Sequence, residues 1–139
     1  MQQGYTVYRN AAIDTNDQGK LILVAYDVAI KHCKLALDEF ELKDKIEERT
    51  RHLFKAQDAI TELLSALKVD VGEIARNLYR LYDYMLRTLV EAGVHNNSQK
   101  VTEVLGYLEN LRSAWDVAIR KLKSESGPSI EIGSVAVQG

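Results

Sequence analysis

The sequence predicts an all-α protein, an antiparallel four-helix bundle with an N-terminal leader segment packed over a groove and a flexible C-terminal tail. The only proline is Pro128, so residues 1–127 lack the strongest helix breaker. Four segments repeat apolar residues at helical spacing. The connections between them are about 2 to 8 residues long, which suits antiparallel neighbours. The 139 residues therefore form one helical domain over 1–123, followed by a tail over 124–139.

Composition and charge exclude several classes of protein. Eighteen Lys and Arg against twenty Asp and Glu give a formal charge of −2, so we expect no nucleic-acid partner. The longest wholly apolar run, from Leu21 to Ala25, is too short for membrane insertion. The single cysteine, Cys33, cannot form an internal disulfide, and residues 1–17 lack the features of a secretory signal. We therefore expect a cytoplasmic protein.

The leader, residues 1–16, has no sustained periodicity but holds Tyr5, Tyr8 and Ile13. This is more apolar and aromatic material than a free tail needs, so we expect these side chains to be packed against the domain. The first helix is predicted over about 17–41, with either Asp17 or Thr15 as its N-cap.

The first helix carries two apolar stripes about a third of a turn apart. One stripe consists of Leu21, Val24, Ala25, Val28, Leu35 and Ala36, and the other of Ile22, Tyr26, Ile30, Cys33, Leu37 and Phe40. The remaining polar face is narrow. On it Asp27 lies four residues before Lys31, and Lys34 lies four residues before Asp38, which is the spacing of ion pairs within a helix. Two stripes predict a helix that either lies at the centre of the bundle or binds a ligand.

The second helix is predicted over about 43–68 and the third over about 71–93. Small residues on the second helix would allow another helix to approach closely, and its basic run over 43–55 reads as a solvated face. Asp70 and Glu73 predict a capping box at the start of the third helix, and Gly93 predicts its C′ position.

The fourth helix is predicted over about 97–122, with Asn96 or Asn97 as its cap and a single apolar face. The residues after Leu122 have the composition of a linker. The first and third helices are apolar over more of their circumference than one four-helix core uses. We therefore expect apolar surface to remain for a ligand.

No constellation for catalysis or metal binding is visible. The residues three before His32, His52 and His95 are not carboxylates, and no two histidines share a helical face, so we expect no metal and no cofactor. Neighbouring residues on a helix point about 100° apart, so Cys33 and His32 read as a core cysteine beside a surface histidine. No glycine pattern forms a phosphate loop. The sequence does not indicate an enzyme.

Seven tyrosines allow two interpretations. They are either core and boundary residues or parts of a protein-binding surface, because tyrosine combines a large contact area with few rotatable bonds.

Four strings in order resemble the flagellar secretion chaperone family, FliS. Tyr5 and Tyr8 with Thr15 resemble the leader of the family, and LILVAYD over 21–27 resembles its first helix. KAQDAITEL over 55–63 and LYDYMLRTLVEAG over 81–93 resemble the next two helices, and Trp115 stands where the family has a closing tryptophan. The resemblance covers about residues 5–120.

The resemblance implies a cytoplasmic chaperone that binds the disordered C-terminal segment of flagellin, prevents premature polymerisation and keeps the subunit competent for flagellar type III secretion. Contacts with the export gate and with other flagellar regulators are left open. We expect the flagellin-binding groove to be lined by Ile22, Tyr26, Ile30, Leu63, Tyr79, Tyr82 and Leu86. In the free protein Tyr5, Tyr8 and Ile13 of the leader would cap it. The alternative is a helical adaptor or regulatory module that binds a folded protein surface.

Overall fold

A computed structural model describes residues 18–68, 70 and 72–126. The described residues form four α-helices and one short 3₁₀ helix, and no strand occurs among them. The elements are α2 (Gln18–Glu39), η2 (Lys43–Lys45), α3 (Ile46–Ala66), α4 (Glu73–Val94) and α5 (Ser98–Ser126). The all-α, four-helix prediction is confirmed. The predicted roles of the leader and of the tail lie outside the described residues.

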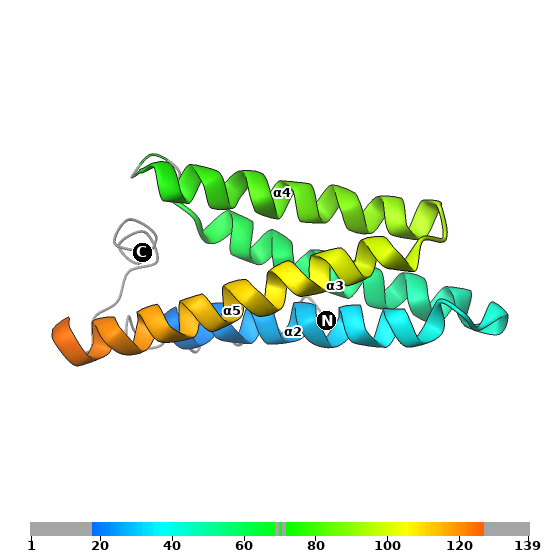
Figure 1. Ribbon diagram of the computed structural model, residues 1–139, viewed down its shortest axis with the longest axis horizontal. Coiled ribbons are helices and arrows are strands. Elements are labelled where there is room, and N and C mark those ends of the chain that lie inside the picture. Colours follow the sequence, from blue (N-terminus) through cyan, green and yellow to red (C-terminus); the bar gives the residue numbers. More distant parts are fainter. Residues whose placement is uncertain (1–17, 69, 71, 127–139) are drawn as a thin grey trace.

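The helices pack as a ring of antiparallel neighbours. α2 contacts α3 and α5, α3 also contacts α4, and α4 also contacts α5 (Figure 1). The α2–α3 connection and the α4–α5 turn lie at the same end of the bundle, and α4 and α5 diverge toward the other end in this view. Each helix therefore has two neighbours, and those of α2 are α3 and α5.

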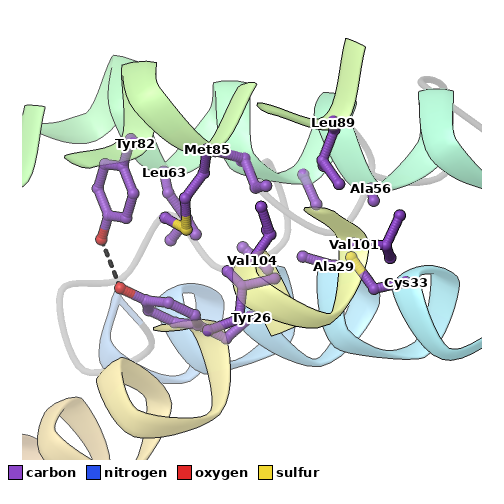
Figure 2. Close-up of a cluster of buried hydrophobic side chains, with 14 of the residues drawn as sticks. Tyr26, Ala29, Cys33, Ala56, Leu63, Tyr82, Met85, Leu89, Val101 and Val104 are labelled. Atoms are coloured by element: carbon purple, nitrogen blue, oxygen red, sulfur yellow. Dashed lines mark hydrogen bonds between the residues drawn. The ribbon is translucent and has the colours of Figure 1, made fainter. Parts of the chain in front are cut away.

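The core combines small residues between α2 and α3 with larger side chains toward the centre. Ala25, Ala29 and Ala36 of α2 and Ala56 and Ala59 of α3 are all buried, so the two backbones can approach closely. Larger buried side chains from all four helices fill the centre, as Figure 2 shows in part. They are Ile22, Tyr26, Leu53, Ile60, Leu63, Tyr82, Met85, Leu89, Val101, Val104, Leu108, Trp115 and Ile119.

One glycine is also a packing residue in this core. A Cβ atom at Gly19, in the first turn of α2, would lie 2.7 Å from Cγ2 of Ile119 on α5. Such a distance is well inside van der Waals contact, so Gly19 lets the first turn of α2 approach α5 closely.

Both predicted ends of the third helix are corrected. α4 begins at Glu73 with Gly72 as its N-cap, and no side chain caps it, so the predicted Asp70 cap is wrong. At the other end Asn96, with φ of 50°, takes the left-handed position predicted for Gly93, and the Asn97 N–H donates to the Ala92 carbonyl at 2.9 Å. This is the Schellman pattern shifted three residues along the chain.

The start of α5 agrees with the prediction, whereas its end does not. The Oδ1 atom of Asn97 accepts a hydrogen bond from the Gln99 N–H at 3.1 Å, which makes Asn97 the cap. The helix continues to Ser126, four residues beyond the predicted end at Leu122.

The predicted ion pairs within the first helix are replaced by pairs between helices. Arg112 of α5 makes two hydrogen bonds to the Asp27 carboxylate, at 2.7 and 3.2 Å. Lys34 lies 3.5 Å from a carboxylate oxygen of Glu109, also on α5. The polar face of α2 therefore borders α5, and these exposed pairs set the register of two helices while adding little to stability.

Candidate functional site

The described residues give no sign of a metal centre. In the described ranges no three His, Cys, Asp or Glu side chains come together in an arrangement that could hold a metal ion. None of the helices in this part of the chain combines the length and the apolar character needed to cross a membrane.

Five of the large apolar side chains that are exposed among the described residues lie on α4. Tyr79, Leu86, Val90 and Val94 are spaced by seven, four and four residues and so share one face of the helix. Tyr79, Val90 and Val94 are exposed and Leu86 is half-buried. From Tyr79 to Val94 this row, the α4 strip, is about 22 Å long at 1.5 Å per residue.

The α4 strip runs along the side of α4 that borders α3. Gly93 continues the spacing of Tyr79 and Leu86, and a Cβ atom at Gly93 would lie 3.3 Å from Cδ1 of Leu53 on α3. Phe54, the residue after Leu53, is 59% exposed. Between Tyr79 and Leu86 the same face of α4 carries Asp83, which pairs with Arg87 at 3.2 Å, so the strip consists of one exposed tyrosine and a separate apolar row from Leu86 to Val94. Exposed apolar rows of this kind are candidates for interaction sites.

The surplus apolar surface predicted for two helices is visible on only one of them. No large apolar side chain of α2 is exposed, although Leu21, Val24 and Leu35 are only half-buried and lie outside the core cluster. On α4, by contrast, Ile74 and Tyr84 are exposed in addition to the members of the strip.

The structure separates the seven predicted groove residues into two groups. Ile22, Tyr26, Leu63 and Tyr82 are buried in the core, and Ile30 is half-buried on α2. Tyr79 and Leu86 belong to the α4 strip. The predicted leader cap of Tyr5, Tyr8 and Ile13 falls outside the described residues.

Tyr26 and Tyr82 form a buried polar contact across the bundle. Their hydroxyl oxygens lie 2.5 Å apart, and Figure 2 shows the two rings pointing toward one another from α2 and α4. Burial raises the pKa of both phenols, that of Tyr82 to about 12, so both keep their protons at neutral pH. Hydrogen bonding to Trp115 of α5 acts in the opposite direction on both pKa values. Three helices therefore meet at one polar cluster.

A second tyrosine pair lies on the surface between α4 and α5. The hydroxyls of Tyr84 and Tyr107 both donate to Oε2 of Glu103, at 2.8 and 3.2 Å. Their rings meet edge to face with centroids 6.4 Å apart. The tyrosines are thus divided between core and surface, so both sequence-based interpretations apply, each to different residues.

Two charged or titratable residues are placed differently from the sequence-based expectation. Arg49, predicted on a solvated face, is buried, and its Nη1 donates to Oδ1 of Asn96 at 2.7 Å. Its guanidinium carbon lies 4.5 Å from the centroid of the Phe40 ring. His32, predicted at the surface, is buried against His52 of α3. Neither contact follows from spacing within one helix, because both partners lie on other elements.

Comparison with known proteins gives a consistent result over nearly the whole chain. The sequence model of the family described as "Flagellar protein FliS" matches residues 1–122. The flagellar secretion chaperone FliS of Bacillus subtilis (strain 168) is 34% identical over 125 residues, covering 90% of this chain and 92% of that protein. The flagellar secretion chaperone FliSB of Pseudomonas aeruginosa PAO1 is 32% identical over 117 residues, covering 84% and 92%. The FliS protein of Vibrio cholerae is 38% identical over 72 residues, covering 51% and 53%.

The buried tyrosine pair predicts non-additive effects of mutation. Tyr82→Phe should lower the free energy of unfolding by about 1 to 2 kcal/mol, because the Tyr26 hydroxyl loses a buried partner. The double variant Y26F/Y82F should lose less than the sum of the two single variants. Urea titrations measure all three values, and Tyr79→Phe, an exposed tyrosine, serves as the control with a change within about 0.5 kcal/mol. Strictly additive losses would show that the pair is not coupled.

Proposed function

The chain belongs to the FliS family of flagellar proteins, and from this membership we propose that it is a flagellar secretion chaperone that binds the disordered C-terminal segment of flagellin. Binding of this segment would prevent premature polymerisation and keep the subunit unfolded for type III secretion. The proposed place of action is the cytoplasm, where export substrates are synthesised. α4 has exposed apolar side chains, and the relatives are named as chaperones, so the proposed role is that of a non-enzymatic chaperone.

The observation that carries the proposal is the α4 strip. A row of apolar side chains about 22 Å long suits an extended or helical segment better than a compact ligand. An amphipathic helix presents apolar residues every three to four positions, which matches the four-residue spacing of Leu86, Val90 and Val94. We propose that such a segment of flagellin lies along α4 and covers the strip.

The energetics favour a ligand that folds as it binds. Coupled folding typically buries about 1,000 to 3,000 Å² and loses roughly 2 to 5 kcal/mol to ordering of the segment. A single row of four side chains is too small for that area, so the segment would also contact neighbouring surface, including Phe54 of α3. The half-buried Ile30 of α2 is a further candidate from the predicted groove.

The buried members of the predicted groove take an indirect part in this proposal. Tyr26, Tyr82, Leu63 and Ile22 support α2, α3 and α4 from within the core. They would reach a ligand only if α4 moved away from α2, and that movement would break the hydrogen bond between Tyr26 and Tyr82.

The leader would regulate the site. We propose that Tyr5, Tyr8 and Ile13 cover apolar surface in the free chaperone and are displaced by flagellin, which would protect the unbound protein from aggregation. The export gate is the proposed destination of the complex.

Circular dichroism tests the binding mode. A peptide of the flagellin C-terminal segment should gain helical signal when mixed with the protein, because it orders on binding. The alternative role, an adaptor for a folded surface, predicts binding of a folded partner and no gain of helix in the peptide. If binding is detected by another method and the spectrum of the mixture still equals the sum of the two separate spectra, coupled folding is contradicted.

A charge placed in the α4 strip should weaken the complex. Val90→Asp should lower the affinity for the flagellin segment about tenfold, equivalent to about 1.4 kcal/mol, because a carboxylate would be buried beneath the ligand. Val117→Asp is the matched control, because Val117 of α5 is 64% exposed and Val90 is 49% exposed. Isothermal titration calorimetry gives both affinities. Equal losses of affinity in the two variants would show that the α4 strip is not part of the binding site.

Deletion of residues 1–13 tests the leader. The shortened chain should keep its helical signal and melting transition, because the core lies within the described helices. Its affinity for the flagellin segment should rise, or its tendency to self-associate should increase, as gel filtration with light scattering would detect. A shortened protein identical to the full chain in both respects would show that the leader covers nothing.

A further inference from the structure

His32 of α2 and His52 of α3 form a contact that the sequence did not predict. Their Nδ1 atoms lie 3.0 Å apart, and the two rings are stacked with centroids separated by 5.2 Å. On the far side of His52, Nε2 lies 3.6 Å from a carboxylate oxygen of Glu39. We propose that His32, His52 and Glu39 form a proton-sensitive latch that holds the C-terminal half of α2 against α3.

The number of protons between the rings decides whether the latch is closed. A hydrogen bond between two Nδ1 atoms needs one donor and one acceptor, so it contains a single proton. In the arrangement in which Nδ1–H of His52 donates to neutral His32, Nε2 of His52 faces the Glu39 carboxylate. When His32 is also protonated, two N–H groups face each other and the contact is lost.

The surroundings of His32 oppose its protonation. Burial lowers its pKa most strongly, followed by the charges of His52 and Lys55 on α3 and of Lys31 on α2, and together they bring the pKa to about 4. Glu39 is the carboxylate of the cluster, and it contacts His52 rather than His32.

Apart from Glu48 of α3, the other charges around this contact are engaged elsewhere or lie on the opposite flank of α2. On α3, Arg49 binds Asn96, and Glu48 has a buried carboxylate oxygen without a hydrogen bond. α5, the other helix that packs on α2, directs Arg112 to Asp27 and Glu109 to Lys34. Asp27 and Lys34 lie about 140 to 160° around the helix from His32 at 100° per residue, so the charges of α5 do not offset those near the latch.

The latch makes stability fall as the solution is acidified. In the unfolded chain a histidine takes up its proton near pH 6.5, whereas folded His32 remains neutral until about pH 4. Between these values the unfolded state binds the extra proton, so its share of the population increases. The stabilisation is fully present above about pH 6.5 and is lost progressively as the pH approaches 4.

The full-length protein labelled with ¹⁵N in its histidines provides the test, because the chain contains only three of them. His32→Gln, His52→Gln and His95→Gln assign the three signals. We expect the His32 ring to remain neutral at about pH 5, where an ordinary histidine is charged, and to show the coupling of a hydrogen bond between the two Nδ1 atoms. Titration of His32 near 6.5 would overturn the proposal, and this measurement needs only the wild-type protein once the signals are assigned.

Equilibrium unfolding in urea gives a second readout. From about pH 7 to about pH 5 the folding constant of the wild type should fall roughly tenfold more than that of His32→Gln, whose amide can hydrogen-bond to His52 but does not titrate. His95→Gln is the matched control, because His95 is exposed at the end of α4, and it should behave as the wild type. An identical pH dependence in His32→Gln and the wild type would contradict the latch.

Discussion

The close packing of α2 against α3 is the contact on which the rest of the structure depends. Alanines on both helices remove the side-chain volume that would keep the backbones apart. With α3 on one flank and α5 on the other, α2 buries or half-buries its large apolar residues. α4 completes the ring from the opposite corner, and its apolar residues extend past the core onto the outer surface. The unequal burial of these two helices leaves more exposed apolar surface on α4 than on α2.

Polar contacts inside the bundle set the relative positions of the helices. The Tyr26–Tyr82 hydrogen bond joins diagonally opposite helices, and at one end of the bundle Arg49 connects Phe40 with the α4–α5 turn. Buried groups of this kind are destabilising when they lose a partner, so the correct register is favoured over a slipped one. A ligand that moved α4 would have to compensate for the loss of the tyrosine contact. A ligand that lies on the α4 strip leaves this hydrogen bond intact, whereas a ligand that enters the core must break it.

The sequence was sufficient for the features that depend on local periodicity. Apolar spacing and the position of Pro128 predicted four helices, and the chemistry of helix starts limited the cap of α5 to Asn96 or Asn97, of which Asn97 is the cap. Features that depend on contacts between helices were not accessible in this way. The burial of His32 and Arg49 and the pairing of Asp27 with Arg112 each involve a partner from another element. The end of α4 was misplaced because Gly93 and Asn96 can both adopt the left-handed conformation, and packing against Leu53 keeps Gly93 inside the helix. For the candidate site, composition could not separate Tyr79, which is exposed, from Tyr82, which is buried three residues later.

Site-specific photo-crosslinking tests the central claim that α4 presents the ligand-binding surface. The only cysteine, Cys33, is buried, and burial raises the pKa of its thiol to about 12, so a cysteine introduced at the surface can be labelled selectively. A photoreactive group attached to Val90→Cys should crosslink to the flagellin C-terminal segment, whereas the same group on Val117→Cys should not. Crosslinking from position 117 with none from position 90 would contradict the account.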